Sequence, residues 1–274
     1  MQEQESEFYI GWQAEAPPGI ARLIRRFLLV LAVLVPVLAL LIVGFQRGFS
    51  NGTFEYGKTT ELEGILTSSP VPFLTIYTGN DAAGNPVLQK ILLVAAGKFG
   101  FEQGDGGRWK ELAQTADKQP VRVSGFLIYR DGKTALEVDN IQTETATPTP
   151  GTNAASNAAL GIVTLRGEIA DPKCLFGVMK PGAGKPHRDC AARCIAGGIP
   201  PLLKVENAGH DAEYYLLVGP NGEALNSRLL EFAADGVQVC GQLEQQDDWL
   251  VLYADPGTLQ RVNKYALNPG PLCH

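Results

Sequence analysis

Residues 121–138 read VRVSGFLIYRDGKTALEV, a run in which apolar and polar side chains alternate on both sides of an Asp-Gly pair. Alternation with a period of two is typical of half-buried β-strands, and Asp131-Gly132 between two such runs is a hairpin signal. A related stretch, VQVCGQLEQQDDWLVLYA, occupies residues 237–254. Because both stretches begin with the pattern V-x-V-x-G, the sequence predicts an internal repeat.

The repeat continues toward the N-terminus of each copy. Three further landmarks match in the same order, namely Leu62-Glu-Gly with Leu165-Arg-Gly, Pro72-Phe-Leu with Pro201-Leu-Leu, and Leu92-Leu-Val with Leu216-Leu-Val. Between the third landmark and the V-x-V-x-G pattern, each copy has a short helical pattern, at 109–116 and 227–234. Each copy therefore predicts about five short strands with one helix before the last hairpin.

This order of elements resembles the oligonucleotide/oligosaccharide-binding (OB) barrel, in which closure of a five-stranded sheet removes exposed edges. The resemblance implies a mainly β protein with two small OB-like barrel domains, each with one short helix. We place the barrels at 57–143 and 160–256, followed by a C-terminal tail at 257–274. Residues 144–159 are rich in Thr, Pro, Ala and Asn, and this composition predicts a linker.

The N-terminal part of the chain predicts one membrane span. Residues 27–45 read FLLVLAVLVPVLALLIVGF, which is 19 residues without a charge. As a helix, such a run extends about 28 Å, close to the hydrocarbon thickness of a bilayer. Pro36 lies mid-run, where a membrane span tolerates it. We expect a cytoplasmic tail at 1–26 and a transmembrane helix at 27–46.

The charges beside the span predict its orientation. Arg22, Arg25 and Arg26 precede it, against Arg47 after it. The positive-inside rule then places the N-terminus in the cytoplasm and the barrels outside, in the periplasm of a bacterium with the span in the inner membrane. A cleaved signal peptide is the alternative, but no small-x-small cleavage pattern follows the apolar run.

Composition argues against a nucleic-acid partner. The chain has 29 acidic and 23 basic residues, for a net charge of −6. A phosphate backbone would be repelled, and no basic block with interleaved aromatic residues offsets this charge. We therefore expect membrane and protein partners, and no nucleic acid.

One segment is present in the second copy of the repeat and absent from the first. Residues 171–201, DPKCLFGVMKPGAGKPHRDCAARCIAGGIPP, hold three of the five cysteines, one of the three histidines and Met179. From landmark Gly to landmark Pro the first copy takes 8 residues and the second takes 34. Since one barrel is predicted to fold without this Cys/His insertion, we interpret the insertion as the functional part of the second barrel.

Local sequence signals predict which elements carry the cysteines of the Cys/His insertion. Asp189 is a suitable N-cap for a short helix over 190–196, which would put Cys190 and Cys194 on one face. Cys174 is expected to end the incoming strand, with His187 in a loop near the helix. Cys190 at the first helical position, beside basic residues, would favour a thiolate.

Three interpretations of these residues compete. The first is a pair of disulfides, Cys174 with Cys190 or Cys194, and Cys240 with Cys273, as an oxidising compartment favours. The second is a metal site, whose candidate ligands are Cys174, His187, Cys190 and Cys194, with Met179 as a further soft donor. Thiolate and imidazole ligands suit zinc, and a thioether would favour copper(I). The third is thiol redox chemistry at Cys190 and Cys194.

Two resemblances bear on this choice. Cys190-Ala-Ala-Arg-Cys194 is similar to the CxxxC of copper-delivery proteins of the Sco type, although Ile195 follows where those motifs have Pro. The segment H-R-D-C-A-A-R-C-I-A-G-G-I-P-P after D-P-K-C resembles exported, single-pass bacterial proteins of uncharacterised activity, with tandem OB-like domains.

The chain contains no nucleotide-binding, hydrolase or metalloprotease motif. We therefore predict a non-catalytic accessory or assembly component of a membrane protein complex. The alternative is a periplasmic metal-handling or thiol-redox protein acting through Cys190 and Cys194. Binding of a glycan or peptide by the barrels would need an exposed aromatic face that the sequence does not clearly predict.

Overall fold

The structure is a computed structural model that describes residues 17–47, 52–143, 157–206, 212–262 and 273. Contacts between its residues divide the chain into two compact units, Met1–Phe49 and Ser50–His274. The first contains helix α1 (Pro18–Arg47), which includes Pro36. This helix is long and apolar enough to cross a membrane, which is compatible with an anchor or with a signal sequence.

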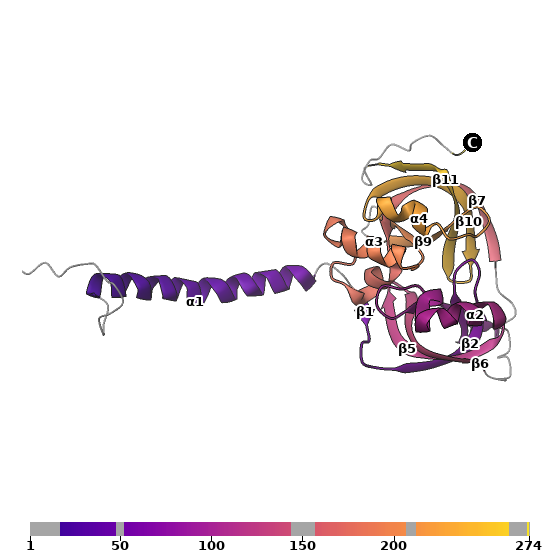
Figure 1. Cartoon of the computed structure of the whole chain (residues 1–274), viewed down its shortest axis with the longest axis horizontal. Coiled ribbons are helices and arrows are strands. Elements are labelled where there is room, and N and C mark those ends of the chain that lie inside the picture. The colour runs from indigo at the N-terminus through magenta and orange to yellow at the C-terminus, as the bar shows by residue number, and fades with distance from the viewer. Residues whose placement is uncertain (1–16, 48–51, 144–156, 207–211, 263–272, 274) are drawn as a thin grey trace, which may run out of the picture. The chain divides into compact units, whose positions relative to one another are not determined.

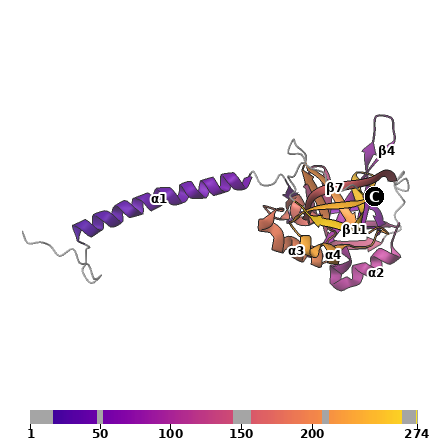
Figure 2. The same ribbon diagram turned by 90° about the horizontal axis from the view of Figure 1, so that it is seen from above.

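The second unit contains two five-stranded barrels (Figure 1). The first barrel is built from β2 (Thr60–Thr67), β3 (Phe73–Asn80), β4 (Pro86–Ala95), β5 (Pro120–Arg130) and β6 (Lys133–Thr143). The short strand β1 (Thr53–Phe54) adds to β5. Helices η1 (Phe101–Gly107) and α2 (Arg108–Thr115) lie between β4 and β5. The tip of the β3–β4 hairpin projects from this barrel (Figure 2).

The second barrel repeats this plan. Its strands are β7 (Asn157–Ala170), β8 (Leu202–Glu206), β9 (Ala212–Val218), β10 (Gly236–Gln246) and β11 (Trp249–Arg261). Helices α4 (Asn226–Leu229) and η4 (Leu230–Phe232) separate β9 from β10. Between β7 and β8 the Cys/His insertion forms η2 (Cys174–Val178), η3 (Lys185–His187) and α3 (Arg188–Ala196).

Strand pairing is the same in both barrels and confirms the predicted fold class. In each, the first strand pairs with the second and fourth, and the third pairs with the fifth in parallel. The predicted hairpin between β5 and β6 is confirmed. Asp131 and Gly132 both have positive φ, 48° and 76°, and the flanking residues Arg130 and Lys133 are paired. This is the geometry that a two-residue hairpin requires.

Each barrel has a hydrophobic cluster of its own, and a further cluster is shared by both. Phe73 and Leu92 of the first barrel belong to the same buried cluster as Phe176 and Trp249 of the second. The Trp249 indole donates a hydrogen bond to the Lys90 carbonyl at 2.8 Å and packs 5.3 Å from the ring of Phe73. Because this surface is apolar and continuous, the barrels bury it against each other.

Three local predictions about the Cys/His insertion are wrong. Helix α3 begins at Arg188 with His187 as its N-cap, so Asp189 lies inside the first turn and is not the cap. Cys190 is therefore the third helical residue and not the first. Strand β7 ends at Ala170, and Cys174 opens a π-helical turn in place of ending the strand. The predicted domain boundaries stay a prediction.

Candidate metal and thiol site

The site begins where β7 ends. Asp171 follows the strand, and its Oδ1 accepts the backbone N–H of Cys174 at 2.8 Å, which fixes the start of the π-helical turn. The chain then passes through a turn to η3, whose last residue is His187, and enters α3. Four consecutive elements thus bring residues that lie far apart in sequence to one place.

Two overlapping groups of donor atoms converge there. The Sγ atoms of Cys174 and Cys190 and a ring nitrogen of His187 lie within 4.8 Å of one another. A carboxylate oxygen of Asp171 forms a second such group with the Sγ atoms of Cys174 and Cys194. All three cysteines are free thiols, and the Cys174 and Cys190 sulfur atoms are 3.8 Å apart. Of the three, only Cys190 is partly exposed.

The imidazole of His187 is oriented by a buried carboxylate. Its Nε2 lies 3.2 Å from Oδ2 of Asp171, and the side chains of both residues are almost fully buried. Carboxylate–imidazole pairs of this kind fix the tautomer and the ring orientation of metal-binding histidines. With Nε2 facing Asp171, Nδ1 is the nitrogen left for other chemistry.

A lysine from the first barrel completes the surroundings. Nζ of Lys98, in the loop after β4, donates a hydrogen bond to Cys190 Sγ at 2.7 Å. That hydrogen bond raises the pKa of Lys98, with burial acting in the opposite direction. The cation thus brings positive charge to the three thiols of the cluster.

The two buried thiols differ in their protonation chemistry. A hydrogen bond to Cys194, together with burial and the charge of Asp171, raises the pKa of Cys174 far above that of a free thiol. The same hydrogen bond lowers the pKa of Cys194, and the charge of Lys98 lowers it further, whereas burial acts in the opposite direction. Cys174 is therefore the thiol donor, and Cys194 is the sulfur that ionises more readily.

Met179 differs from the other four candidate ligands in its exposure to solvent. Its backbone N–H donates to the Cys174 carbonyl at 3.4 Å, but its side chain is 43% exposed. The predicted role of Met179 as a further ligand stays a prediction, as does metal binding by the other four residues.

Contacts across the barrel seam hold the site in place. Lys173 is buried, donates to the carbonyls of Ala95 and Gly97 at 2.8 and 2.7 Å, and forms an ion pair with Glu137. In addition, the backbone N–H of Gly100 donates to the Gly197 carbonyl at 2.9 Å. Both contacts join the Cys/His insertion to the first barrel, so the site lies at the junction of the two.

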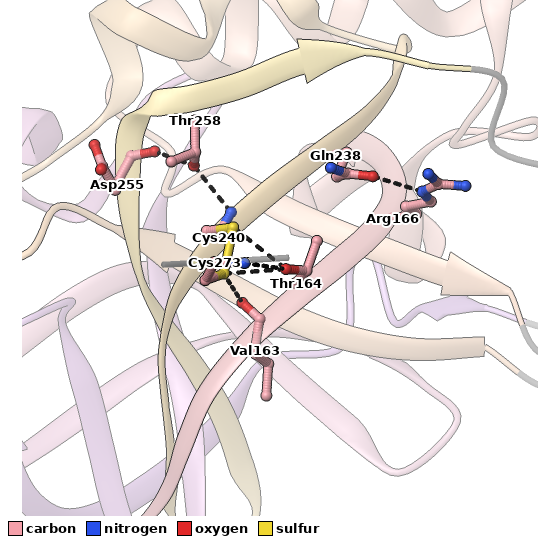
Figure 3. The surroundings of a disulfide bond; sticks show 8 residues. All are labelled: Val163, Thr164, Arg166, Gln238, Cys240, Asp255, Thr258 and Cys273. Atoms are coloured by element: carbon pink, nitrogen blue, oxygen red, sulfur yellow. Dashed lines mark hydrogen bonds between the residues drawn. A yellow bond between two sulfur atoms is a disulfide. The ribbon is translucent and has the colours of Figure 1, made fainter. Parts of the chain in front are cut away.

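Cys240 and Cys273 form a disulfide, one of the pairings that the sequence left open. Thr164 Oγ1 lies 3.3 Å and 3.0 Å from the two sulfur atoms, and the backbone N–H of Cys240 donates to Thr258 Oγ1 (Figure 3). The disulfide ties Cys273 to strand β10 beside β7. It therefore leaves the three cysteines of the insertion unpaired.

Two residues of the site were missed by sequence reasoning. Asp171 is the first residue of the Cys/His insertion. An Asp that precedes a cysteine by three residues can accept a backbone hydrogen bond from it, as in an Asx-type turn, and this spacing could have predicted its contact with Cys174. Lys98 offers no such signal, because only the packing of one barrel on the other brings it to Cys190. Two further predictions concern residues outside the described ones, namely that His210 is a solvated loop histidine and that the aromatic residues at 8–12 pack on a partner or on the membrane surface.

No family model matches the chain, and no curated protein matches it either. Among solved structures, it is similar to a deletion mutant of the single-stranded DNA binding protein from Thermus aquaticus, at 17% identity. The match covers 81% of this chain and 92% of that one, with a TM-score of 0.19. A score this low carries no argument about function.

Proposed function

We propose that this protein is a membrane-anchored accessory component of a membrane protein complex, with a site for a thiophilic metal ion in its second barrel. Cys174, His187, Cys190 and Cys194 are the proposed ligands, and zinc or copper(I) is the proposed ion. The observation that supports the site best is the convergence of free thiols and an imidazole within 4.8 Å.

The chemistry of the donors fits such an ion. Thiolate sulfur and neutral imidazole are the ligands that zinc and copper(I) prefer, and a bound cation offsets the cost of burying thiolates. Asp171 supports this role because it holds His187 from the far side of the ring. A metal ion in this position would link η2, η3 and α3, and so stabilise the Cys/His insertion.

Metal analysis of the full chain, purified in detergent under reducing conditions, tests the site. We expect close to one zinc or copper ion per chain, and loss of most of it on His187→Ala or Cys174→Ser. His210→Ala is the matched control and should retain the ion. A metal-free wild-type protein that also fails to take up added zinc and copper(I) would refute the site. Met179→Leu tests whether the thioether contributes.

The accessory role is a separate part of the proposal. It rests on helix α1, which is suited to a bilayer, and on the absence of an enzyme motif from the sequence. In this proposal α1 lies in the inner membrane with its N-terminus in the cytoplasm, and the barrels face the periplasm. Gentle detergent extraction should recover the chain together with other membrane subunits. Recovery of free monomer alone, under conditions that preserve other complexes, would contradict it.

Thiol redox chemistry is the second candidate function. It is favoured by the 3.8 Å separation of the Cys174 and Cys190 sulfur atoms and by the lowered pKa of Cys194. In this case Cys190→Ser and Cys194→Ser would abolish disulfide exchange with a small dithiol and leave folding intact. Metal content would then be low in wild type and variants alike, which separates this function from the first.

A further inference from the structure

The hydrogen bond from Lys98 to Cys190 is short for one to a sulfur atom. An N–H···O bond has a donor–acceptor distance of about 2.9 Å, and sulfur is a larger atom than oxygen. Yet Lys98 Nζ and Cys190 Sγ are 2.7 Å apart. One oxygen atom bonded to both nitrogen and sulfur spans a separation of this size.

The backbone holds this pair together from both sides. The loop that carries Lys98 receives a hydrogen bond from Lys173 at the Gly97 carbonyl, and Gly100 donates to the Gly197 carbonyl. A Cβ on Gly197 would overlap the backbone carbonyl of Lys98. The loop and the end of α3 are therefore in direct backbone contact, which keeps the backbone of Lys98 beside the helix that carries Cys190.

An oxidant can reach this sulfur more readily than its neighbours. Cys174 and Cys194 are 3% and 1% exposed, whereas Cys190 and Lys98 are both half-buried. Oxidation of a cysteine depends on the access of the oxidant to its sulfur. Cys190 is thus the sulfur of this cluster that a small peroxide would attack first.

We propose that Lys98 and Cys190 form a covalent N–O–S bridge when the protein meets hydrogen peroxide. One peroxide oxidises the Cys190 thiol to a sulfenic acid, breaks its O–O bond and releases one water. The Lys98 ammonium loses a proton to solvent, and a second peroxide oxidises the neutral amine to a hydroxylamine, again breaking its O–O bond and releasing one water. Condensation of the two products forms the bridge and releases a third water. The pair loses four electrons in total, and two peroxide molecules accept them.

Reduction reverses this reaction. Two equivalents of a dithiol supply four electrons, restore the amine and the thiol, and release the bridging oxygen as water. The bridge would join the first barrel to α3 covalently. It does not depend on the proposed metal site, although a bridged Cys190 could no longer serve as a thiolate ligand.

The competing reaction is a disulfide between Cys174 and Cys190, because a sulfenic acid also condenses with a nearby thiol. The distances favour the bridge, because Cys190 Sγ lies 2.7 Å from the Lys98 nitrogen and 3.8 Å from the Cys174 sulfur. The two products differ in mass, since the bridge adds one oxygen and removes two hydrogens, whereas a disulfide only removes two hydrogens.

Mass spectrometry of the metal-free full chain, treated with hydrogen peroxide and digested without reduction, tests the proposal. We expect a peptide pair joined through Lys98 and Cys190 with the mass of the bridge, lost on treatment with dithiothreitol. Lys98→Arg keeps the positive charge and should abolish the pair, and Lys58→Arg, at an exposed lysine, should retain it. In Cys174→Ser, where the competing disulfide is impossible, the pair should persist.

Two results would overturn the proposal. One is a Cys174–Cys190 disulfide as the sole oxidation product, formed equally in wild type and in Lys98→Arg. The other is peroxide oxidation of Cys190 to sulfinic acid with no product linked to Lys98, even in Cys174→Ser. Both would be seen in the same digests, so failure here is distinguishable from an absence of metal binding.

Discussion

Asp171 organises the candidate site at the scale of a single residue. One of its oxygen atoms accepts the N–H of Cys174 and the other faces His187. Asp171→Asn keeps the shape but removes the charge that orients the ring. We expect metal affinity to fall about 10- to 100-fold, as for other outer-shell partners of metal-binding histidines. Competition with a chromophoric chelator, on the full chain, measures this change.

Asp189 provides the matched control. It is an exposed acid in the first turn of α3, so Asp189→Asn should leave the affinity unchanged. Equal affinities for Asp171→Asn and wild type would show that the carboxylate does not act on the ligands. Chemical denaturation of both variants without metal separates an effect on the site from an effect on folding.

At the scale of elements, the Cys/His insertion joins the two barrels through Lys173. This side chain is buried, and its positive charge balances the negative charge of Glu137 in an ion pair. Lys173→Met would leave Glu137 and two carbonyls without their donor. Breaking a buried pair from one side costs about 3 to 5 kcal/mol, and we expect a decrease of this size in the free energy of unfolding.

Chemical denaturation of the full chain measures this decrease. Lys180→Met, at an exposed lysine of the same insertion, should change stability by less than about 0.5 kcal/mol. Adding Glu137→Gln to Lys173→Met removes the unpaired charge and should recover part of the loss. Similar stabilities for Lys173→Met and Lys180→Met would contradict a role for Lys173 in joining the barrels.

A comparison of the predicted and observed elements shows which parts of this fold the sequence predicts. Alternation and the Asp131-Gly132 turn predict the strands and their hairpin, because both signals are local. The start of α3 was misplaced because Asp189 satisfies the local rule for an N-cap, while the preceding 3-10 turn η3 already leads the chain into the helix. Lys98 could not be predicted at all, since its contact with Cys190 spans 92 positions and two barrels.

For the whole molecule, the span and the disulfide are linked through the compartment. If α1 anchors the chain with its barrels outside the cytoplasm, Cys240 and Cys273 meet an oxidising environment, which disulfides require to persist. A chain that lacks residues 27–45 would stay in the reducing cytoplasm. We expect Cys240 and Cys273 to resist alkylation in cells that make the full chain, and to be alkylated in cells that make the truncated one.

Cys190 serves as an internal reference for this experiment, because it is a free and partly exposed thiol in the same chain. Mass mapping of each alkylated cysteine identifies the pair, and Cys273→Ser should expose Cys240 to alkylation in the full chain. Alkylation of both Cys240 and Cys273 in unreduced full-length protein would contradict the proposed orientation. Where the barrels fold in an oxidising compartment, the disulfide should stabilise them by about 2 to 4 kcal/mol, because it closes a loop across 33 positions.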